Sequence, residues 1–257
     1  MAVSGRYARL KLFPFADFTK MAGKRVAVIG VGGLGALSAE ILARCGVGSL
    51  ALFDYDTVEV ANLNRLVYRQ SQVGQPKAKA ITAHLKEANP RVRVTAYPND
   101  VTDGKGLKAL VKELDRCDLV LGCVDSFQVR MFLNSKCVAA KIPFVDGGAS
   151  VDGINGSVHV VLPGKTPCYR CNRPAARETA TVRTARRDDT GMCHFTSLPT
   201  TMAVISSLQC QEALKILLGF GSVAPYILYY GLEGKLDRYD WKRDPRCPVC
   251  GKLGRRR

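Results

Sequence analysis

The segment with the most specific chemistry is a glycine-rich turn, Gly30-Val31-Gly32-Gly33-Leu34-Gly35, which follows a short β-branched apolar run. A strand that enters such a turn and continues as a helix permits close approach of a phosphate to the backbone at the helix N-terminus. The carboxylate of Asp54, at the end of the next apolar run, is placed to accept hydrogen bonds from ribose hydroxyls. These residues together predict a nucleotide site.

Two cations and one acid indicate what happens to the nucleotide. Arg65 and Lys77 follow the acidic run that begins at Asp54, and such a pair can stabilise charge on an α-phosphate and a departing pyrophosphate. Asp125 directly follows an apolar run, where carboxyl ends of strands converge and a carboxylate can hold Mg²⁺. The alternative is that both cations are solvated surface residues and that Asp125 caps the following helix.

Four cysteines have the local spacing of a metal site. Cys168 and Cys171 form one C-x-x-C pair, and Cys247 and Cys250 form another. Four thiolates in two such pairs suit one tetrahedral structural Zn²⁺, with the long gap closed by the fold. A disulfide or redox role for either pair is the alternative.

Cys193 differs from the other cysteines. It lies beside His194, near Arg186 and Arg187, shortly before a helix that begins near Ser197. Neighbouring positive charge and a helix N-terminus lower a thiol pKa and favour a nucleophile. The alternative is an incidental loop cysteine. The remaining five sit in apolar patterns and are expected to be small core residues: Cys45, Cys117, Cys123, Cys137 and Cys210.

Alternating strand and helix patterns are expected to position these groups. Strands are predicted near 24–30, 49–53, 92–96, 118–123 and 143–145, and helices near 36–45, 77–88, 107–114 and 127–140. Repeated βα pairs predict a Rossmann-like, doubly wound, mostly parallel sheet. Beyond Gly147 the pattern predicts antiparallel additions at 157–162, 226–230 and 235–241, with a long basic loop over about 172–197.

Composition bounds the class of protein. The chain has 257 residues, of which 47% are hydrophobic, which is enough to bury a core. No apolar run is long enough for a membrane span and no signal peptide is evident, so we expect a cytoplasmic protein with no membrane partner. The formal net charge of +16 predicts attraction to polyanions, or else solubility in a hot or salty cell.

The motifs in combination resemble the adenylation domain of ubiquitin-activating and related enzymes, a superfamily that includes bacterial adenylyltransferases for sulfur-carrier proteins. The resemblance covers nearly the whole chain and is nearest to the activating enzymes of ubiquitin-fold modifier 1. The segments that carry this nearer likeness are Arg44–Gly48, Leu52–Asp56, Ala61–Leu66, Gly191–Cys193 and Ser197–Met202.

The resemblance implies a homodimer that binds ATP·Mg²⁺ and the C-terminal glycine of a small β-grasp protein, with a conjugating enzyme as a possible further partner. It implies that Cys193 is the thioester-forming nucleophile and that Arg9 reaches the ATP of the neighbouring subunit. The nucleotide and metal contacts that it implies are the glycine turn, Asp54, Asp56, Asn62, Arg65, Lys77, Asp100, Asp125 and Ser126. Asp100 and Ser126 stand where the nearest relative has asparagine, and both exchanges are expected to retune the adenosine contacts.

The resemblance also implies a division of the chain, taken as one adenylation domain over 1–257. Residues 1–23 form an N-terminal arm, 24–150 the nucleotide-binding half, and 151–257 the modifier-binding half with the zinc knuckles and the crossover loop.

Three other functions stay open at this point. A sulfur-carrier adenylyltransferase would stop at the acyl adenylate or pass it to a persulfide. A nucleotide-dependent oxidoreductase would use the same glycine turn, but hydride transfer has no evident use for Arg65 and Lys77. A basic zinc-ribbon module would bind nucleic acid through its positive charge. We do not expect nucleic acid as a partner.

Overall fold

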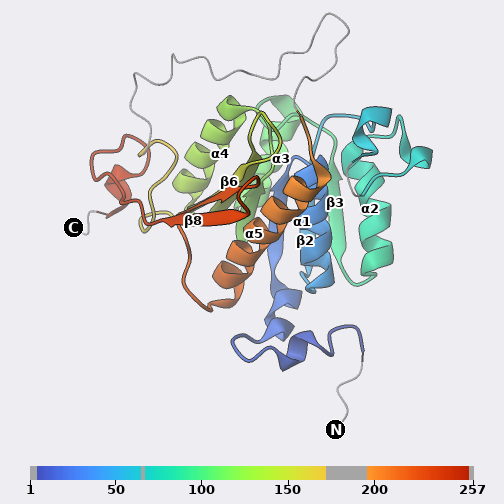
Figure 1. Cartoon of the computed structure of the whole chain (residues 1–257), viewed down its shortest axis with the longest axis horizontal. Coiled ribbons are helices and arrows are strands. Elements are labelled where there is room, and N and C mark those ends of the chain that lie inside the picture. The colour runs from blue at the N-terminus through green and yellow to red at the C-terminus, as the bar shows by residue number, and fades with distance from the viewer. Residues whose placement is uncertain (1–4, 65–66, 172–195, 255–257) are drawn as a thin grey trace, which may run out of the picture.

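A computed structural model describes residues 5–64, 67–171 and 196–254 of the chain. Within these residues eight strands form one sheet in the order β3-β2-β1-β4-β5-β6-β7-β8 (Figure 1). The strands are β1 Arg25–Ile29, β2 Ser49–Phe53, β3 Arg93–Tyr97, β4 Leu119–Gly122, β5 Phe144–Ala149, β6 Gly156–Val161, β7 Tyr226–Tyr230 and β8 Lys235–Tyr239.

The sheet has a parallel part and an antiparallel part. β1 pairs in parallel with both β2 and β4, with Val26 opposite Leu50 on one side and Leu119 on the other. Pairing is parallel through β5 and antiparallel from β5 to β8. The predicted fold class, a Rossmann-like sheet with an antiparallel C-terminal extension, is therefore confirmed. Strands β2 and β3 are added on one side of β1, and β4 and β5 on the other, so the order of strand addition reverses between β1 and β4. Ligands in open α/β folds bind at this point.

Helices cover both faces of this sheet, as Figure 1 shows. The α-helices are α1 Gly33–Arg44, α2 Lys77–Ala88, α3 Gly104–Leu114, α4 Phe127–Ala140 and α5 Pro199–Leu218. The 3-10 helices are η1 Leu10–Leu12, η2 Phe18–Gly23, η3 Val60–Asn62, η4 Gln70–Gln72 and η6 Gly251–Gly254. One hydrophobic cluster joins α1, α2 and α5 to the sheet, and a second joins α3, α4 and the zinc-knuckle cysteines to its other face.

The alternation of side chains along β1 explains the two clusters. Val26 and Val28 point into the first cluster, while Ala27 and Ile29 point into the second. All four are buried, so β1 is apolar on both faces, as expected for a central parallel strand.

A buried glutamine fixes α5 against the sheet. Gln209 Nε2 donates to the carbonyl oxygens of Gly122 and Val145, at 2.9 Å each, and Gln209 Oε1 accepts from Ser38 Oγ at 3.1 Å. These bonds connect α5 with β4, β5 and α1 in a site that water does not reach.

Most element boundaries agree with the sequence-based predictions to within three residues, and two differences have physical reasons. β5 continues to Ala149, beyond the predicted end at Val145, because its glycines pair with β6 through Ala149 opposite Gly156. β8 ends at Tyr239, two residues before the predicted end, and Trp241 instead stacks on Tyr226 at 4.3 Å.

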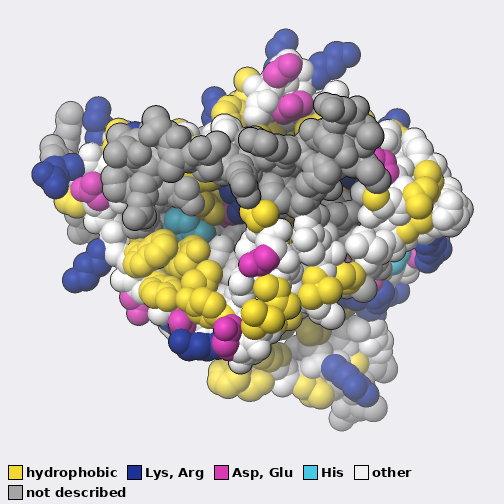
Figure 2. Space-filling model, turned by 45° about the horizontal axis from the view of Figure 1, so that its top comes forward, with side chains coloured by type: hydrophobic (Ala, Val, Ile, Leu, Met, Phe, Trp, Pro, Cys, Tyr) yellow, Lys and Arg dark blue, Asp and Glu magenta, His cyan; other side chains and the backbone are white. Residues whose placement is uncertain are grey.

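The face shown in Figure 2 carries both hydrophobic and charged side chains. On this face (Figure 2), hydrophobic side chains form a band from the left to the lower centre, and most Lys and Arg side chains lie toward the periphery. Among the described residues, no helix combines the length and the apolar character that a membrane crossing requires.

Candidate functional site

The glycine turn lies at the reversal point between β1 and β4. Gly30 has a φ of +83°, and a Cβ there would stand 2.6 Å from the Cys123 carbonyl oxygen. A Cβ on Gly35 would stand 1.9 Å from the Gly30 carbonyl oxygen. Gly30 must therefore be glycine because of its positive φ and the close carbonyl oxygen, and Gly35 because of the close carbonyl oxygen alone.

Gly32 has a different reason for being glycine. It is the N-cap of α1, its φ of −67° suits any residue, and a Cβ there would meet nothing within 4 Å. The open space therefore adjoins the first turn of α1, where Gly33 begins the helix and backbone N–H groups favour an anion. The turn thus fits a phosphate group of a nucleotide.

Asp54 shapes the turn from the end of β2. Its Oδ2 accepts from Val31 N at 2.8 Å, and its Oδ1 accepts from Asp56 N at 2.9 Å. Burial raises the pKa of Asp54, although Lys77 and the two backbone donors oppose that rise. Asp54 lies at the carboxyl end of β2, as predicted. The sequence pattern indicated a contact with ribose, and these bonds show that Asp54 also holds the backbone of the glycine turn.

Tyr68 is a site residue that sequence reasoning missed. Its buried hydroxyl donates to the Val31 carbonyl oxygen at 2.5 Å, so both polar groups of Val31 are held, one by Asp54 and one by Tyr68. A tyrosine in an irregular loop carries no sequence signal for this contact.

Lys77 is the first residue of α2, and its Nζ lies 2.8 Å from Asp56 Oδ2. Only 11% of the Lys77 side chain is exposed, so this cation is held at the same edge and is not a solvated surface charge. Arg65, the other predicted cation, lies outside the described residues.

Asp125 follows β4 and is exposed, with no hydrogen bond or ion pair to any other residue in the described ranges. The alternative role as a helix cap is wrong, since Ser126 is the N-cap of α4 and its Oγ accepts from Val129 N at 3.4 Å. The Asp125 carboxylate, a hard oxygen ligand, therefore stays available to a metal ion such as Mg²⁺.

Two further predicted site residues take part in local structure. Asn62 Oδ1 accepts from Glu59 N at 3.0 Å in η3, and Asp100 Oδ1 accepts from Thr102 N at 2.8 Å after β3. Both residues follow strands whose carboxyl ends face the glycine turn. Arg9 does not join them: the N-terminal arm packs at the amino ends of the strands, where Tyr7 lies against Gly46 (Figure 1).

The two predicted zinc knuckles meet. The Sγ atoms of Cys168, Cys171, Cys247 and Cys250 all lie within 4.8 Å of one another. Cys168 Sγ is 3.7 Å from Cys247 Sγ, and Cys171 Sγ is 3.3 Å from Cys250 Sγ. Tetrahedral Zn–S bonds of about 2.3 Å place sulfur atoms about 3.8 Å apart, so the four thiols fit a Zn²⁺ site. Asp244 N lies 3.5 Å from Cys171 Sγ and adds an outer contact.

Cys193 and most of the predicted crossover loop lie outside the described residues. Of the five cysteines expected in the core, Cys117, Cys137 and Cys210 are buried, and Cys45 and Cys123 are partly buried. Burial raises the pKa of Cys45 to about 11, and that of Cys210 to about 12. These thiols therefore stay protonated at neutral pH and are poor nucleophiles.

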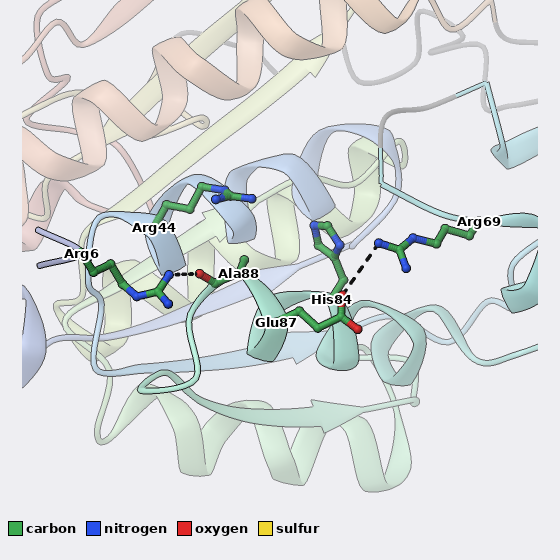
Figure 3. A pocket seen from close by; sticks show the side chains of 6 residues that line it. All are labelled: Arg6, Arg44, Arg69, His84, Glu87 and Ala88. Atoms are coloured by element: carbon green, nitrogen blue, oxygen red, sulfur yellow. Dashed lines mark hydrogen bonds and ion pairs between the residues drawn. The ribbon is translucent and has the colours of Figure 1, made fainter.

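A cavity of about 350 Å³ lies elsewhere, between the arm and the C-terminal ends of α1 and α2 (Figure 3). Its cationic residues are paired within the chain: Arg6 donates to the Ala88 carbonyl oxygen, Arg44 and His84 contact Glu40, and Arg69 faces Glu87 at 3.8 Å. The cavity is remote from the glycine turn and we assign it no role.

Comparison with known proteins identifies the family. The model of the ThiF family matches residues 4–249. The chain is 37% identical over 246 residues to ubiquitin-like modifier-activating enzyme 5 of Oryza sativa subsp. japonica, which covers 91% of this chain and 58% of that protein. It is 38% identical over 239 residues to the Caenorhabditis elegans protein of the same name, and this alignment covers 90% of this chain and 56% of that protein. The chain thus spans a little over half the length of these curated relatives.

A structural likeness supports the fold. E. coli MccB, solved with AMPCPP and MccA, superposes with a TM-score of 0.80 at 24% identity, covering 96% of this chain and 75% of that one. The fold is shared with MccB, and the match over residues 4–249 confirms the predicted superfamily: the chain belongs to the ThiF family.

Proposed function

We propose that this chain uses ATP to adenylate the C-terminal glycine of a small ubiquitin-like protein and then takes the acyl group on Cys193 as a thioester. The observation that carries the proposal is the meeting of the glycine turn, Asp54, Lys77 and Asp125 at one edge of the sheet, beside β1 and β4. The names of the relatives favour modifier activation over hydride transfer or nucleic-acid binding.

In this proposal the chain's own residues perform distinct tasks. The N-terminus of α1 receives a phosphate beside Gly32, while Asp54 shapes the turn and faces the ribose. Lys77 and Arg65 stabilise the negative charge that builds on the α-phosphate and on the departing pyrophosphate. Asp125 is the residue that would hold Mg²⁺, which neutralises phosphate charge when bound.

Two bond exchanges follow. A carboxylate oxygen of the modifier attacks the α-phosphorus, the bond to the bridging oxygen breaks, and pyrophosphate leaves. The Cys193 sulfur then attacks the acyl carbon, AMP departs, and the thiol proton passes to solvent. We assign 151–257 to modifier binding on the resemblance alone.

We also propose a homodimer in which Arg9 serves the neighbouring subunit's ATP. The position of the arm at the amino ends of the strands supports this, because Arg9 lies on the opposite edge from its own glycine turn. A conjugating enzyme as the next acceptor and a cytoplasmic location stay predictions from the sequence.

The test is exchange of radiolabelled pyrophosphate into ATP, with Mg²⁺ and each small β-grasp protein ending in glycine from the same genome. We expect Cys193→Ala to keep exchange and to lose a reducible adduct with the modifier, and Cys45→Ala to keep both. Wild-type protein that returns no label with any partner contradicts the proposal. Exchange without any thioester points to the sulfur-carrier alternative, and a reducible adduct in Cys193→Ala means that another thiol is the nucleophile.

A further inference from the structure

Three polar side chains, two buried and one partly buried, connect the zinc knuckle with the site edge. Tyr169 lies between Cys168 and Cys171, and its hydroxyl donates to Asp146 Oδ2 on β5. Arg130 Nη1 on α4 contacts the same oxygen. Asp146 is 1% exposed, so both contacts form in a water-excluded environment where hydrogen bonds to a charge are strong.

The other arm of Arg130 reaches the loop that carries Asp125. Arg130 Nη2 donates to the Val124 carbonyl oxygen at 2.5 Å, one residue before Asp125. Gly148 leaves room for this arrangement, since a Cβ there would stand 2.5 Å from Arg130 Nη2. The guanidinium therefore joins β5 to the connection between β4 and α4.

The knuckle contacts α4 a second time, through its backbone. Tyr169 N donates to Asn134 Oδ1 at 3.1 Å, and Asn134 lies one helical turn beyond Arg130. The peptide at Tyr169 thus holds α4 directly, while its side chain acts on Arg130 through Asp146. Tyr169 thus contacts α4 directly and, through Asp146, the side chain that bonds Val124.

Stability alone gives a weak reason for this arrangement. A buried ion pair often stabilises a protein no more than apolar side chains of the same volume. Asp146 Oδ1 also lacks a hydrogen-bond partner among the described residues, which is a further cost. Fixed geometry at Val124 is what the pair supplies and an apolar pair would not.

We propose that Tyr169, Asp146 and Arg130 are positioning residues that hold the Asp125 loop against the zinc knuckle, so that Mg²⁺ arriving with ATP meets a pre-oriented carboxylate. The inference rests on the proposed function, in which Asp125 holds Mg²⁺. None of the three residues need touch the nucleotide. Their effect is expected on the Mg²⁺-dependent part of ATP binding.

The test compares Tyr169→Phe with a matched control, Tyr97→Phe, in the full chain. Tyr97 OH also donates to a buried carboxylate, Glu113 Oε1 at 2.7 Å, but this bond does not lead to Asp125. The measurements are zinc content, thermal unfolding, and the affinity for ATP in MgCl₂ and for ATP in EDTA. Neither variant is expected to lose zinc.

We expect Tyr169→Phe to weaken ATP binding in Mg²⁺ roughly threefold and to leave binding in EDTA unchanged, the effect of one lost hydrogen bond. Arg130→Lys is expected to lose more, roughly tenfold, because an ammonium cannot bond Asp146 and Val124 together as the planar guanidinium does. Tyr97→Phe is expected to keep the wild-type ratio of the two affinities. Should Arg130→Lys not fold, Tyr169→Phe alone still decides.

An unchanged ratio in Tyr169→Phe overturns the inference, as does an equal loss of affinity with Mg²⁺ and with EDTA, which indicates general loosening. The proposed function fails separately, if wild-type protein itself binds no ATP or shows no preference for the Mg²⁺ complex.

Discussion

Lys77 Nζ lies 2.8 Å from Asp56 Oδ2, where the loop after β2 meets the first residue of α2. The Lys77 side chain is 11% exposed and the Asp56 side chain 34%, so the pair is only partly screened by solvent. In the proposed function, a triphosphate entering this edge would compete with Asp56 for the ammonium, which Asp56 already orients.

The first prediction removes that cation. Lys77→Met keeps most of the apolar stem and deletes the charge, so we expect the rate of ATP–pyrophosphate exchange to fall on the order of 10²-fold. Lys79→Met is the matched control, because Lys79 is exposed two residues further along α2. A Lys77→Met protein that exchanges as fast as the control contradicts the phosphate role of Lys77.

The second prediction separates two glycines of one turn. Gly35→Ala places a Cβ 1.9 Å from a backbone oxygen, and we expect it to lower the free energy of unfolding by about 1–3 kcal/mol. Gly32→Ala meets open space, so we expect normal urea unfolding and weakened ATP binding, because the methyl group occupies the proposed phosphate position. Unimpaired ATP binding by Gly32→Ala shows that the phosphate lies elsewhere.

The sequence predicts well what depends on local pattern. The helix over 77–88 and the strand over 49–53 agree with the structure to the residue, because apolar periodicity and flanking turn residues set their ends. The meeting of the two C-x-x-C knuckles is also confirmed, since these four of the ten cysteines have the local spacing of metal ligands.

Contacts between distant segments were not predictable from pattern. Tyr68 meets Val31 across 37 residues, and Gln209 meets Gly122 across 87. One signal was available: Asp146 is an acidic residue in an otherwise apolar strand, and such a residue needs a buried partner. The strand pattern does not say that the partner is Arg130.

The third prediction concerns zinc. Cys247→Ser removes one of four thiol ligands, and we expect it to lower the midpoint of thermal unfolding on the order of 10 °C and to reduce zinc content. A chelator should act on wild-type protein in the same direction. Cys45→Ser is the control, because Cys45 lies outside the cluster and should keep the full zinc content. A Cys247→Ser protein with unchanged zinc and unchanged melting rules out a structural metal at this cluster.

The last prediction concerns acid stability and the Glu113 carboxylate on α3, whose side chain is fully buried. Burial alone would raise the pKa of Glu113, but hydrogen bonds from Arg25 and Tyr97 and the nearby charge of Arg116 outweigh it and hold that pKa below its ordinary value. Arg25 Nε donates to Oε2 at 2.6 Å and Tyr97 OH to Oε1 at 2.7 Å.

A pKa lowered by folding means that the unfolded chain binds the proton more readily than the native protein. The stabilisation is therefore complete above about pH 4.3, the ordinary value for Glu, and is lost as the pH falls through the lower native pKa. Glu113→Gln cannot ionise, so it should be less stable than wild type at pH 7 by about 1–3 kcal/mol and lose less stability below pH 4. Urea unfolding at several pH values measures both, with Glu87→Gln as the control, since Glu87 is exposed and its ion pair is weak. If Glu113→Gln loses stability on acidification as steeply as wild type, Glu113 is not the group that titrates.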